Sequence, residues 1–301
     1  MNPYHNQTTL YPLLFERNFH PAIWGGEEWL VSGHHSSPSV IANGPLNGMT
    51  LETAAQEFGR ALMGANAPHE ERFPLLFKLI ETHDKLSVQV HPNETTAKTV
   101  GGEPKTEMWY ALERKAELHA GFNPGVGKED VARAIREVNL ERILTKVELQ
   151  PGKALFIPGG LVHAIGADAL IYEVQQSSDT TYRMYDWGRV GKDGKPRTLH
   201  VEQSLATIDC SLRPSVSDGE VICPHFRFAP WKLSETRDLP GDVGTFRVLY
   251  AAEGTVRITW GNDEVRLDAG RAALIPANVP THIVPEHDTL LLVTEIPNAR
   301  M

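Results

Sequence analysis

The sequence predicts a mainly β protein, organised as two β-barrels in one chain with a few helices inserted in the first. Three observations support this class. Short apolar segments recur through the second half of the chain, at 226–233, 246–251, 255–260, 271–275 and 289–295. Turns containing Gly and Pro separate them, as in sandwiches and barrels. Residues 86–91 alternate strictly between apolar and polar, which indicates a strand with two different faces.

A faint internal repeat favours two barrels over one. Segments 150–158 and 267–276 each contain a glycine followed by an apolar residue, Ile and Pro, and a histidine comes soon after, His163 or His282. Pro, Ser, Asp and Gly residues cluster at 212–224. We therefore expect a first domain at 1–215, which carries the metal site, and a second, smaller barrel at 216–301.

Two helical regions interrupt the strand pattern. At 50–63, Thr50 is a suitable N-cap, and apolar residues then fall on one stripe at helical spacing. Residues 128–146 form a second helical region by the same criterion, with a break near Asn139. Two helices within so many strands leave the class unchanged.

Composition excludes several classes of function. The chain has 301 residues with 38 acidic and 29 basic side chains, a formal net charge of −9. This charge argues against nucleic acid or an anionic membrane as the main partner. The two cysteines are too few for a disulfide framework, and the sequence shows no signal peptide and no apolar run of membrane-spanning length. We expect a cytoplasmic protein; its oligomeric state is not predicted.

The polar face of the 86–91 strand carries the first chemical signal. Its residues are Ser87, Gln89 and His91, opposite Leu86, Val88 and Val90. A strand face that carries a hydroxyl, an amide and an imidazole needs a function. We interpret Gln89 and His91 as ligands of a metal ion inside the first barrel.

A second signal is the spacing from Gly152 through Pro158 and Gly160 to His163, which matches the second sequence motif of the cupin superfamily of jelly-roll barrels. Gln89-x-His91 stands where the first cupin motif has His-x-His, and Glu107 fills the glutamate position. Nitrogen and oxygen donors without thiolate suit zinc, although another divalent metal is possible. We expect one Zn²⁺ per chain. Taken singly, His163 fits a hydrogen-bonded core residue, and Glu107 fits a surface pair with Lys105.

Four segments make the resemblance specific: LSVQVHP at 86–92, KTEMWY at 105–110, PGGLVHAIG at 158–166 and TYRMYD at 181–186. They resemble the type I mannose-6-phosphate isomerases, also called phosphomannose isomerases, in their short bacterial form. The likeness covers most of residues 15–205. It implies that Gln89, His91, Glu107 and His163 bind zinc, and that Lys105 and Arg183 act on mannose 6-phosphate. Lys78, Ser87 and Glu173 fall at further pocket positions.

The implied reaction interconverts mannose 6-phosphate and fructose 6-phosphate through an enediolate. A metal ion can polarise the carbonyl, and a cation such as Arg183 or Lys105 can stabilise the oxyanion. Glu173, neutral Lys105 and metal-bound hydroxide are all candidate bases, and the sequence does not choose between them. Lys78, Ser87 and Arg183 are candidates to bind the phosphate.

Other interpretations stay open. The chain could be a cupin isomerase or epimerase of another sugar or sugar phosphate, or a sugar-binding or regulatory cupin without turnover. Arg183 could simply stack on a neighbouring tyrosine, and Glu173 could have a structural role. The charged run 189–197 is read as an exposed loop, with closure over the phosphate as the alternative. His282 has no Gln/His-x-His partner upstream, so we expect the second barrel to be metal-free.

Overall fold

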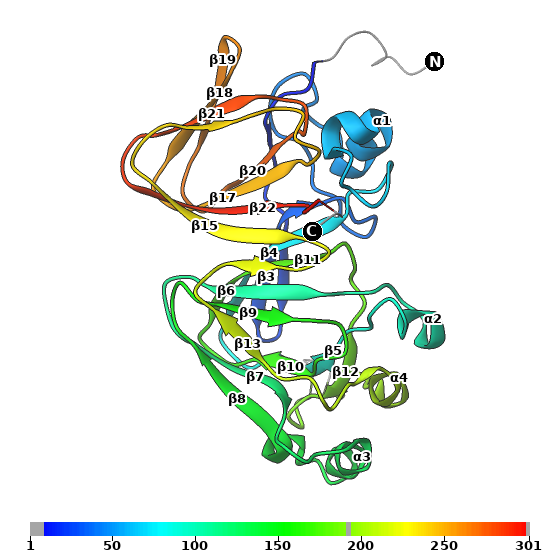
Figure 1. The fold of residues 1–301 in the computed structure, drawn as a ribbon. Coiled ribbons are helices and arrows are strands. Elements are labelled where there is room, and N and C mark those ends of the chain that lie inside the picture. Colours follow the sequence, from blue (N-terminus) through cyan, green and yellow to red (C-terminus); the bar gives the residue numbers. More distant parts are fainter. Residues whose placement is uncertain (1–8, 191–193, 299–301) are drawn as a thin grey trace. The chain divides into compact units, whose positions relative to one another are not determined.

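The computed structural model describes residues 9–190 and 194–298 (Figure 1). The first eight residues, part of the argument against a signal peptide, and Lys192 of the charged run lie outside the described residues. The mainly β class is confirmed, since antiparallel strands make up most of the regular structure. No helix among the described residues has the length and apolar character needed to cross a membrane.

By internal contacts the chain forms two compact units. The central unit comprises Phe19–Glu28 and Phe77–Asp218. The terminal unit comprises the described residues up to Asn18, Trp29–Leu76 and the described residues from Gly219. One boundary therefore falls within the expected 212–224 segment. The early residues do not follow a simple division at 215/216, because part of them contacts the C-terminal strands. β1 (Leu13–Leu14) pairs with β20 (Ala272–Ile275), and the backbone N–H of Ala277 donates to the carbonyl of Leu62 at 2.9 Å.

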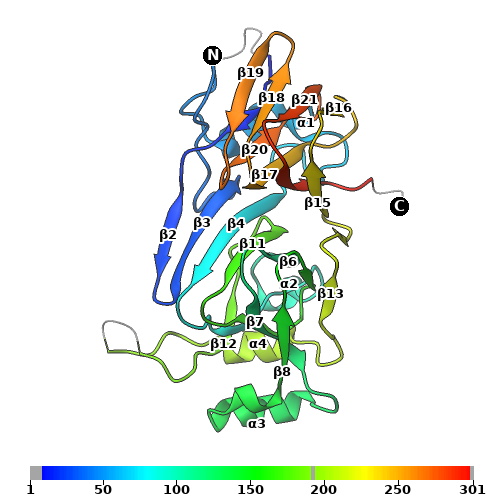
Figure 2. The same cartoon turned by 90° about the vertical axis from the view of Figure 1, so that its left-hand side faces the viewer.

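Two antiparallel sheets form the framework of the central unit. One has the order β13-β9-β6-β11-β4-β3-β2, and the other β12-β5-β10-β7-β8. Figure 2 shows β2, β3 and β4 side by side. The strands are β2 (Phe19–Ala22), β3 (Gly25–Ser32), β4 (Leu75–Thr82), β5 (Val88–Val90), β6 (Glu107–Ala111), β7 (Ala116–Phe122), β8 (Leu144–Leu149), β9 (Ala154–Ile157), β10 (His163–Ile165), β11 (Leu170–Gln176), β12 (Tyr182–Tyr185) and β13 (Ser215–Ser217). Both sheets contribute to one apolar core, which includes Trp109, Leu118, Ile165 and Ile171.

The expected helix at 50–63 is confirmed as α1 (Leu51–Met63), and the Thr50 hydroxyl accepts a hydrogen bond from the Thr53 backbone at 3.1 Å. The 128–146 region is helical only in part. It contains α3 (Lys128–Arg136) and a 3₁₀ turn (Leu140–Ile143), and the positive φ of Val138 marks the break. The helical prediction for 144–146 is wrong, because these residues begin β8, which pairs with β7. Cross-strand pairing and burial override the local helical pattern there.

Helices cover the outer side of the 86–91 strand. Val88 and Val90 pack in a cluster with Val131 of α3 and with Ile208, which directly follows α4 (Val201–Thr207). The short α2 (Ala97–Val100) follows β5 in the chain (Figure 1). With the apolar side chains packed against helices, the polar side chains of the same strand face into the barrel. The predicted two-faced strand is therefore present around Val88–Val90. Leu86 departs from it, because it packs in the other apolar cluster with Trp109 and Ile165.

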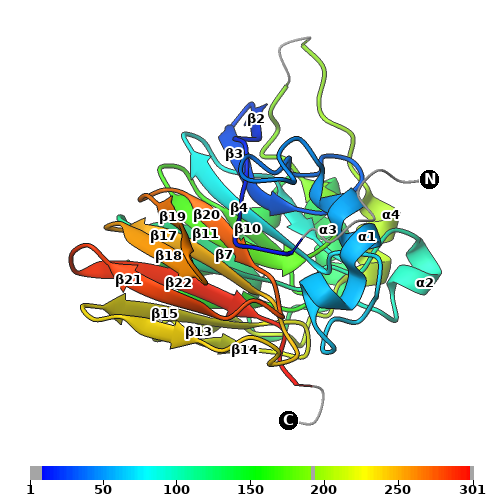
Figure 3. The same ribbon diagram turned by 90° about the horizontal axis from the view of Figure 1, so that it is seen from above.

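The terminal unit repeats the plan. Its sheets have the orders β1-β20-β17-β22-β15-β14 and β16-β21-β18-β19, and Figure 3 shows β15 and β22 side by side. The further strands are β14 (Val221–Ile222), β15 (Arg227–Leu233), β16 (Arg237–Leu239), β17 (Arg247–Glu253), β18 (Val256–Trp260), β19 (Asp263–Leu267), β21 (Thr281–Pro285) and β22 (Thr289–Glu295). All five strands predicted here are present, with shifts of one or two residues at some ends. This two-sheet architecture agrees with the cupin-type fold that the sequence predicts.

A candidate metal centre and active site

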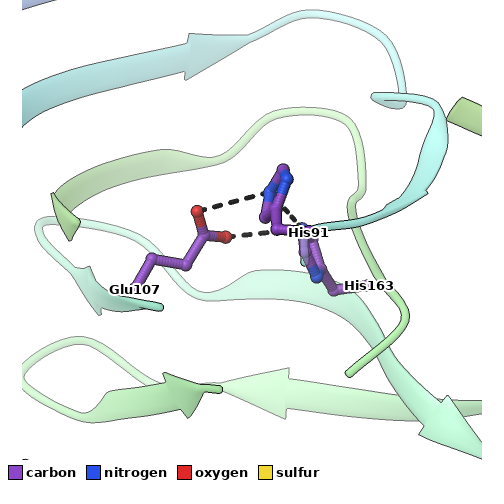
Figure 4. A group of neighbouring side chains, drawn as sticks. All are labelled: His91, Glu107 and His163. Atoms are coloured by element: carbon purple, nitrogen blue, oxygen red, sulfur yellow. Dashed lines mark hydrogen bonds and ion pairs between the residues drawn. The ribbon is translucent and has the colours of Figure 1, made fainter. Parts of the chain in front are cut away.

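Three buried side chains from three segments converge inside the central unit (Figure 4). His163 begins β10, Glu107 begins β6, and His91 directly follows β5. The two histidine Nε2 atoms lie 3.1 Å apart. The Glu107 oxygens lie 3.5 Å from His91 Nε2 and 3.4 Å from His163 Nε2. The structure thus brings together three of the four side chains expected to bind metal.

The turn at 158–160 positions His163 relative to His91. The backbone N–H of Gly160 donates to the His91 carbonyl at 2.8 Å, which joins the two ligand-bearing segments. Gly160 has a φ of +96°, a conformation that favours glycine. A Cβ on Gly159 would lie 2.8 Å from the backbone nitrogen of Asn93, so only glycine fits there. Backbone conformation and close packing therefore explain the two glycines of the Pro-Gly-Gly sequence.

Hydrogen bonds to carbonyls fix both imidazoles in one tautomer. His91 Nδ1 donates to the Thr180 carbonyl, and His163 Nδ1 donates to the Leu161 carbonyl, each at 2.8 Å. Because a carbonyl only accepts, the proton is on Nδ1, and Nε2 of each neutral ring carries a lone pair rather than a proton. Burial lowers the pKa of His163 to about 4, and burial together with the Lys105 ammonium lowers the pKa of His91. Both rings are therefore neutral near pH 7.

This donor set needs a cation. Two nitrogen lone pairs and a carboxylate face one another without water access, and neither Glu107 oxygen accepts a hydrogen bond among the described residues. A cation does approach: the Lys105 ammonium lies 2.9 Å from Glu107 and 3.1 Å from His91 Nε2. Imidazole and carboxylate donors, with the imidazoles oriented by carbonyls, fit a divalent metal such as zinc.

Gln89, the fourth expected ligand, lies beside this group. It is paired with His163 across β5 and β10, and its Nε2 is 3.3 Å from His163 Nε2. A half-turn about the last side-chain bond would present the amide oxygen, which is the atom that binds metals. On its other side Gln89 is paired with Arg183 of β12. His163, Gln89 and Arg183 therefore form a row across three neighbouring strands.

A second row of buried side chains crosses the opposite sheet. Trp109 Nε1 donates to Glu173 Oε2 at 2.7 Å. The other Glu173 oxygen lies 3.6 Å from the Lys78 ammonium, which is 3.1 Å from Glu27. Burial and the nearby Glu107 raise the pKa of Glu173, opposed by Lys105 and Lys78. Burial lowers the pKa of Lys78, but Glu27 and Glu173 outweigh it and leave that pKa above its ordinary value.

Arg183 and Ser87 are in direct contact. Arg183 Nε donates to the Ser87 hydroxyl at 3.3 Å, and a terminal nitrogen donates to the Thr198 carbonyl at 2.9 Å. The side chain of Arg183 is half-buried. Stacking of Arg183 on a tyrosine, the alternative interpretation, is not among the contacts of the described residues. Arg183 and Ser87 thus offer donors next to Gln89.

The charged run 189–197 is not simply a solvated loop, which corrects that expectation for its two arginines. Arg189 and Arg197 both donate to the buried carboxylate of Asp186, at 2.6 and 2.7 Å. Burial raises the pKa of Asp186, but the hydrogen bonds from Arg197 and Arg189 outweigh it and leave the pKa below its ordinary value. This network holds the segment after β12 together, and Arg189 also links it to Asp84, before β5, at 2.9 Å.

Sequence reasoning missed the partners of the named residues. These are Glu27, the Trp109 indole as a donor to Glu173, the two carbonyls that orient the histidines, and Asp186. Alternation along KTEMWY does place Trp109 on the face of Glu107. The pairing of Trp109 with Glu173 depends on strand register. The carbonyl partners belong to the backbone, which is the same for every residue type, so the sequence does not reveal them.

Comparison with known proteins agrees with this site. Residues 21–124 match the family model described as the type I phosphomannose isomerase catalytic domain. The chain is 33% identical to mannose-6-phosphate isomerase ManA of Bacillus subtilis, over 89% of this chain and 94% of the relative. It is 31% identical to mannose-6-phosphate isomerase of Streptococcus mutans, over 89% and 93%. The crystal structure of mannose 6-phosphate isomerase from Bacillus subtilis has a TM-score of 0.83 at 27% identity, covering 94% of this chain and 99% of that one. The chain therefore belongs to the type I phosphomannose isomerases, a family of enzymes.

Proposed function

We propose that this chain is a zinc-dependent aldose–ketose isomerase that interconverts mannose 6-phosphate and fructose 6-phosphate through an enediolate. The single observation that carries the proposal is the buried His91–Glu107–His163 group, whose ligand atoms all lie within 4.8 Å of one another. The names of the relatives supply the substrate. We further propose that the reaction takes place in the cytoplasm, which the low number of cysteines, two in 301 residues, supports.

Gln89, His91, Glu107 and His163 hold the metal in this proposal. Bound there, zinc polarises the substrate carbonyl and stabilises negative charge on its oxygen. Lys105 is the neighbouring cation. Its nitrogen lies 2.9 Å from Glu107, beside the proposed metal position, and we assign it to stabilise the enediolate rather than to remove a proton. Removing a donor of this kind typically costs about 3–4 kcal/mol of barrier.

Glu173 is the proposed base, which removes the proton next to the carbonyl and returns it to the neighbouring carbon. Its raised pKa brings the carboxylate closer to the operating pH of a general base. The Trp109 indole and the Lys78 ammonium hold its two oxygens, so both residues position the base. Lys78 is buried between two carboxylates, which makes it less suited than Arg183 to receive the phosphate.

Arg183 and Ser87 are the proposed phosphate contacts. A guanidinium suits a phosphate because its N–H groups match the phosphate oxygens in pairs. The proposal keeps a catalytic domain at 1–215 and a second barrel without metal at 216–301, with the early strands shared as described above. Its support is that Leu239, Arg247 and Thr281 stand at the terminal-unit positions that match Gln89, Glu107 and His163.

A coupled assay for fructose 6-phosphate on purified protein, together with metal analysis, tests the proposal. We expect stoichiometric zinc, loss of activity in EDTA and recovery when zinc is added. His163→Ala removes both metal and activity, whereas His282→Ala, a surface histidine of the terminal unit, retains both. Full activity and full metal content in His163→Ala would remove the site assignment.

Two other outcomes are separable. Activity on a different sugar phosphate in a substrate panel indicates another isomerase or epimerase. Zinc and sugar binding without turnover indicates a binding or regulatory cupin.

A further inference from the structure

A second cavity opens at the end of the barrel interior in the terminal unit. Its volume is about 250 Å³. It is lined by Leu239 and Val293, which belong to the apolar core of this unit, and by polar side chains at the rim. The polar lining consists mainly of Arg227, Arg237, Arg247, Asp238 and Glu295. Barrel mouths are common places for small-molecule sites.

Strand register shows that this cavity is the counterpart of the candidate metal centre. Glu107 is paired with Ile157, and Arg247 is paired with Ile275. Each of these isoleucines precedes a proline, and the fifth residue after that proline is His163 in one unit and Thr281 in the other.

The neighbouring strands give the same correspondence. His163 is paired with Gln89, and Thr281 is paired with Leu239. Two residues before Gln89 is Ser87, and two residues before Leu239 is Arg237.

The repeat thus corrects the sequence-based pairing of His163 with His282. His282 is one residue away from the matching position and on the other face of its strand. Its side chain is 59% exposed, and it pairs with Asp238 at 2.6 Å on the surface. The matching positions carry Leu239, Arg247 and Thr281 instead of Gln89, Glu107 and His163. A guanidinium stands where the central unit has its metal-binding carboxylate, so the charge preference of the cavity is reversed.

The guanidinium of Arg237 is positioned to bind an anion. Its guanidinium stacks on the Trp231 ring, 3.6 Å from the ring centroid. Among the described residues it has no hydrogen bond and no ion pair. Stacking holds the guanidinium plane while leaving the N–H groups along its edge available, and these groups match phosphate oxygens.

The other two arginines are each paired with a carboxylate. Arg247 Nε donates to Glu295 at 3.2 Å and a terminal nitrogen donates to the Pro240 carbonyl at 3.3 Å, which fixes this nearly buried side chain. Arg227 shares Glu295 and also pairs with Glu220. Asp238, the other carboxylate of the lining, pairs with His282. Arg237 is therefore the guanidinium of this cavity that has no carboxylate partner among the described residues.

We propose that this cavity binds a small phosphate-bearing anion, with Arg237 and Arg247 as its principal contacts. The free phosphate ion and the phosphate group of a sugar phosphate share this chemistry. The site is separate from the candidate active site, since all of its lining residues belong to the terminal unit.

Calorimetric titration of the zinc-loaded protein tests the proposal, with inorganic phosphate and fructose 6-phosphate as separate probes. Arg237 is exposed, so Arg237→Gln leaves folding intact. We expect this variant to bind phosphate about tenfold more weakly at one site, because one charge-assisted contact is lost. Its kcat/KM for mannose 6-phosphate stays unchanged. The matched control is Arg257→Gln, an exposed arginine of β18 paired with Glu264, and we expect it to bind like wild type.

The two probes separate the sources of the anion. If Arg237→Gln weakens the binding of fructose 6-phosphate more than that of inorganic phosphate, the ligand is a sugar phosphate. An equal loss for both probes indicates that the phosphate group alone is recognised. Equal stoichiometry and affinity of wild type and Arg237→Gln for both probes overturns the proposal.

Discussion

The two barrels of this chain have the same strand order and opposite inner chemistry. In each, six consecutive strands are divided between two sheets in the same way and with matching neighbours, β6 to β11 in the central unit and β17 to β22 in the terminal unit. Apolar residues of both sheets fill each interior. The difference lies in a few inward-facing positions at the open end, where one unit has imidazoles and a carboxylate and the other has arginines and a threonine. The fold therefore depends on the alternating pattern, and the chemistry on these few positions.

The largest effect that this comparison predicts is at Glu107. Glu107→Gln removes the only charged donor of the metal set while keeping its size. We expect metal affinity to fall by more than about 100-fold, beyond what the loss of a supporting residue causes, and activity to fall with it. Metal analysis and the isomerase assay measure both. Thr281→Ala, at the position that matches His163, serves as the control and leaves metal content and kcat unchanged. Retention of stoichiometric metal in Glu107→Gln contradicts the assignment.

The next effect concerns Trp109, which donates to Glu173 at 2.7 Å. A hydrogen bond to a charged group contributes about 1.5–3 kcal/mol, so Trp109→Phe is expected to lower kcat roughly 10- to 100-fold with little change in KM. The same change has a pH signature. An indole N–H stabilises the charged carboxylate, so its loss raises the pKa of Glu173 further, and the acid limb of the kcat/KM profile moves to higher pH. Trp231→Phe in the terminal unit is the control.

The sign of this shift separates a positioning role from a structural one. The pKa of Glu173 is already raised, so a base at this position loses activity as the pH falls through that raised value. A variant that only loosens the barrel would lower activity at every pH and leave the limb in place. If the limb does not move in Trp109→Phe, Glu173 is not the base, or Trp109 does not hold it.

The local sequence pattern was sufficient to predict part of the candidate site, and the register of the paired strands was needed to find the rest. Alternation at 86–91 identified the inward face of Gln89 and His91, because a strand has only two faces. The Pro-Gly-Gly turn identified His163, because its geometry needs glycine. The match of His282 with His163 failed by one residue, and in a strand one residue reverses the face. The Lys78–Glu173–Trp109 row lies on three strands that are distant in sequence, so only the folded sheet reveals it.

A smaller effect is expected at Asp186. Its network with Arg189 and Arg197 follows β12 and so lies outside β6 to β11, the strands that the terminal unit repeats. Asp186→Asn leaves Arg189 and Arg197 without their carboxylate and is expected to lower the free energy of unfolding by about 1–3 kcal/mol at pH 7. The folded-state pKa of Asp186 is below its ordinary value, so this stability is present above the unfolded pKa, near 4, and is lost as the pH falls through the folded value. Denaturant unfolding of both proteins at pH 7 and near pH 3 measures it. A difference between them that grows on acidification contradicts the ion-pair account.

The smallest effect is expected at Thr281, the counterpart of His163. Its hydroxyl is buried, and it has no hydrogen-bond partner among the described residues. Thr281→Val removes this unsatisfied group at nearly constant volume, so the stability of the terminal unit should be unchanged or rise by about 1 kcal/mol. Thr281→His tests whether one residue of the metal set is enough to create a metal site in the terminal unit. It introduces the imidazole of the metal set, but Arg247 stands where Glu107 would be, and a guanidinium repels a metal ion. We therefore expect no second metal in Thr281→His by metal analysis, since Leu239 and Arg247 supply none of the further donors that a zinc site needs.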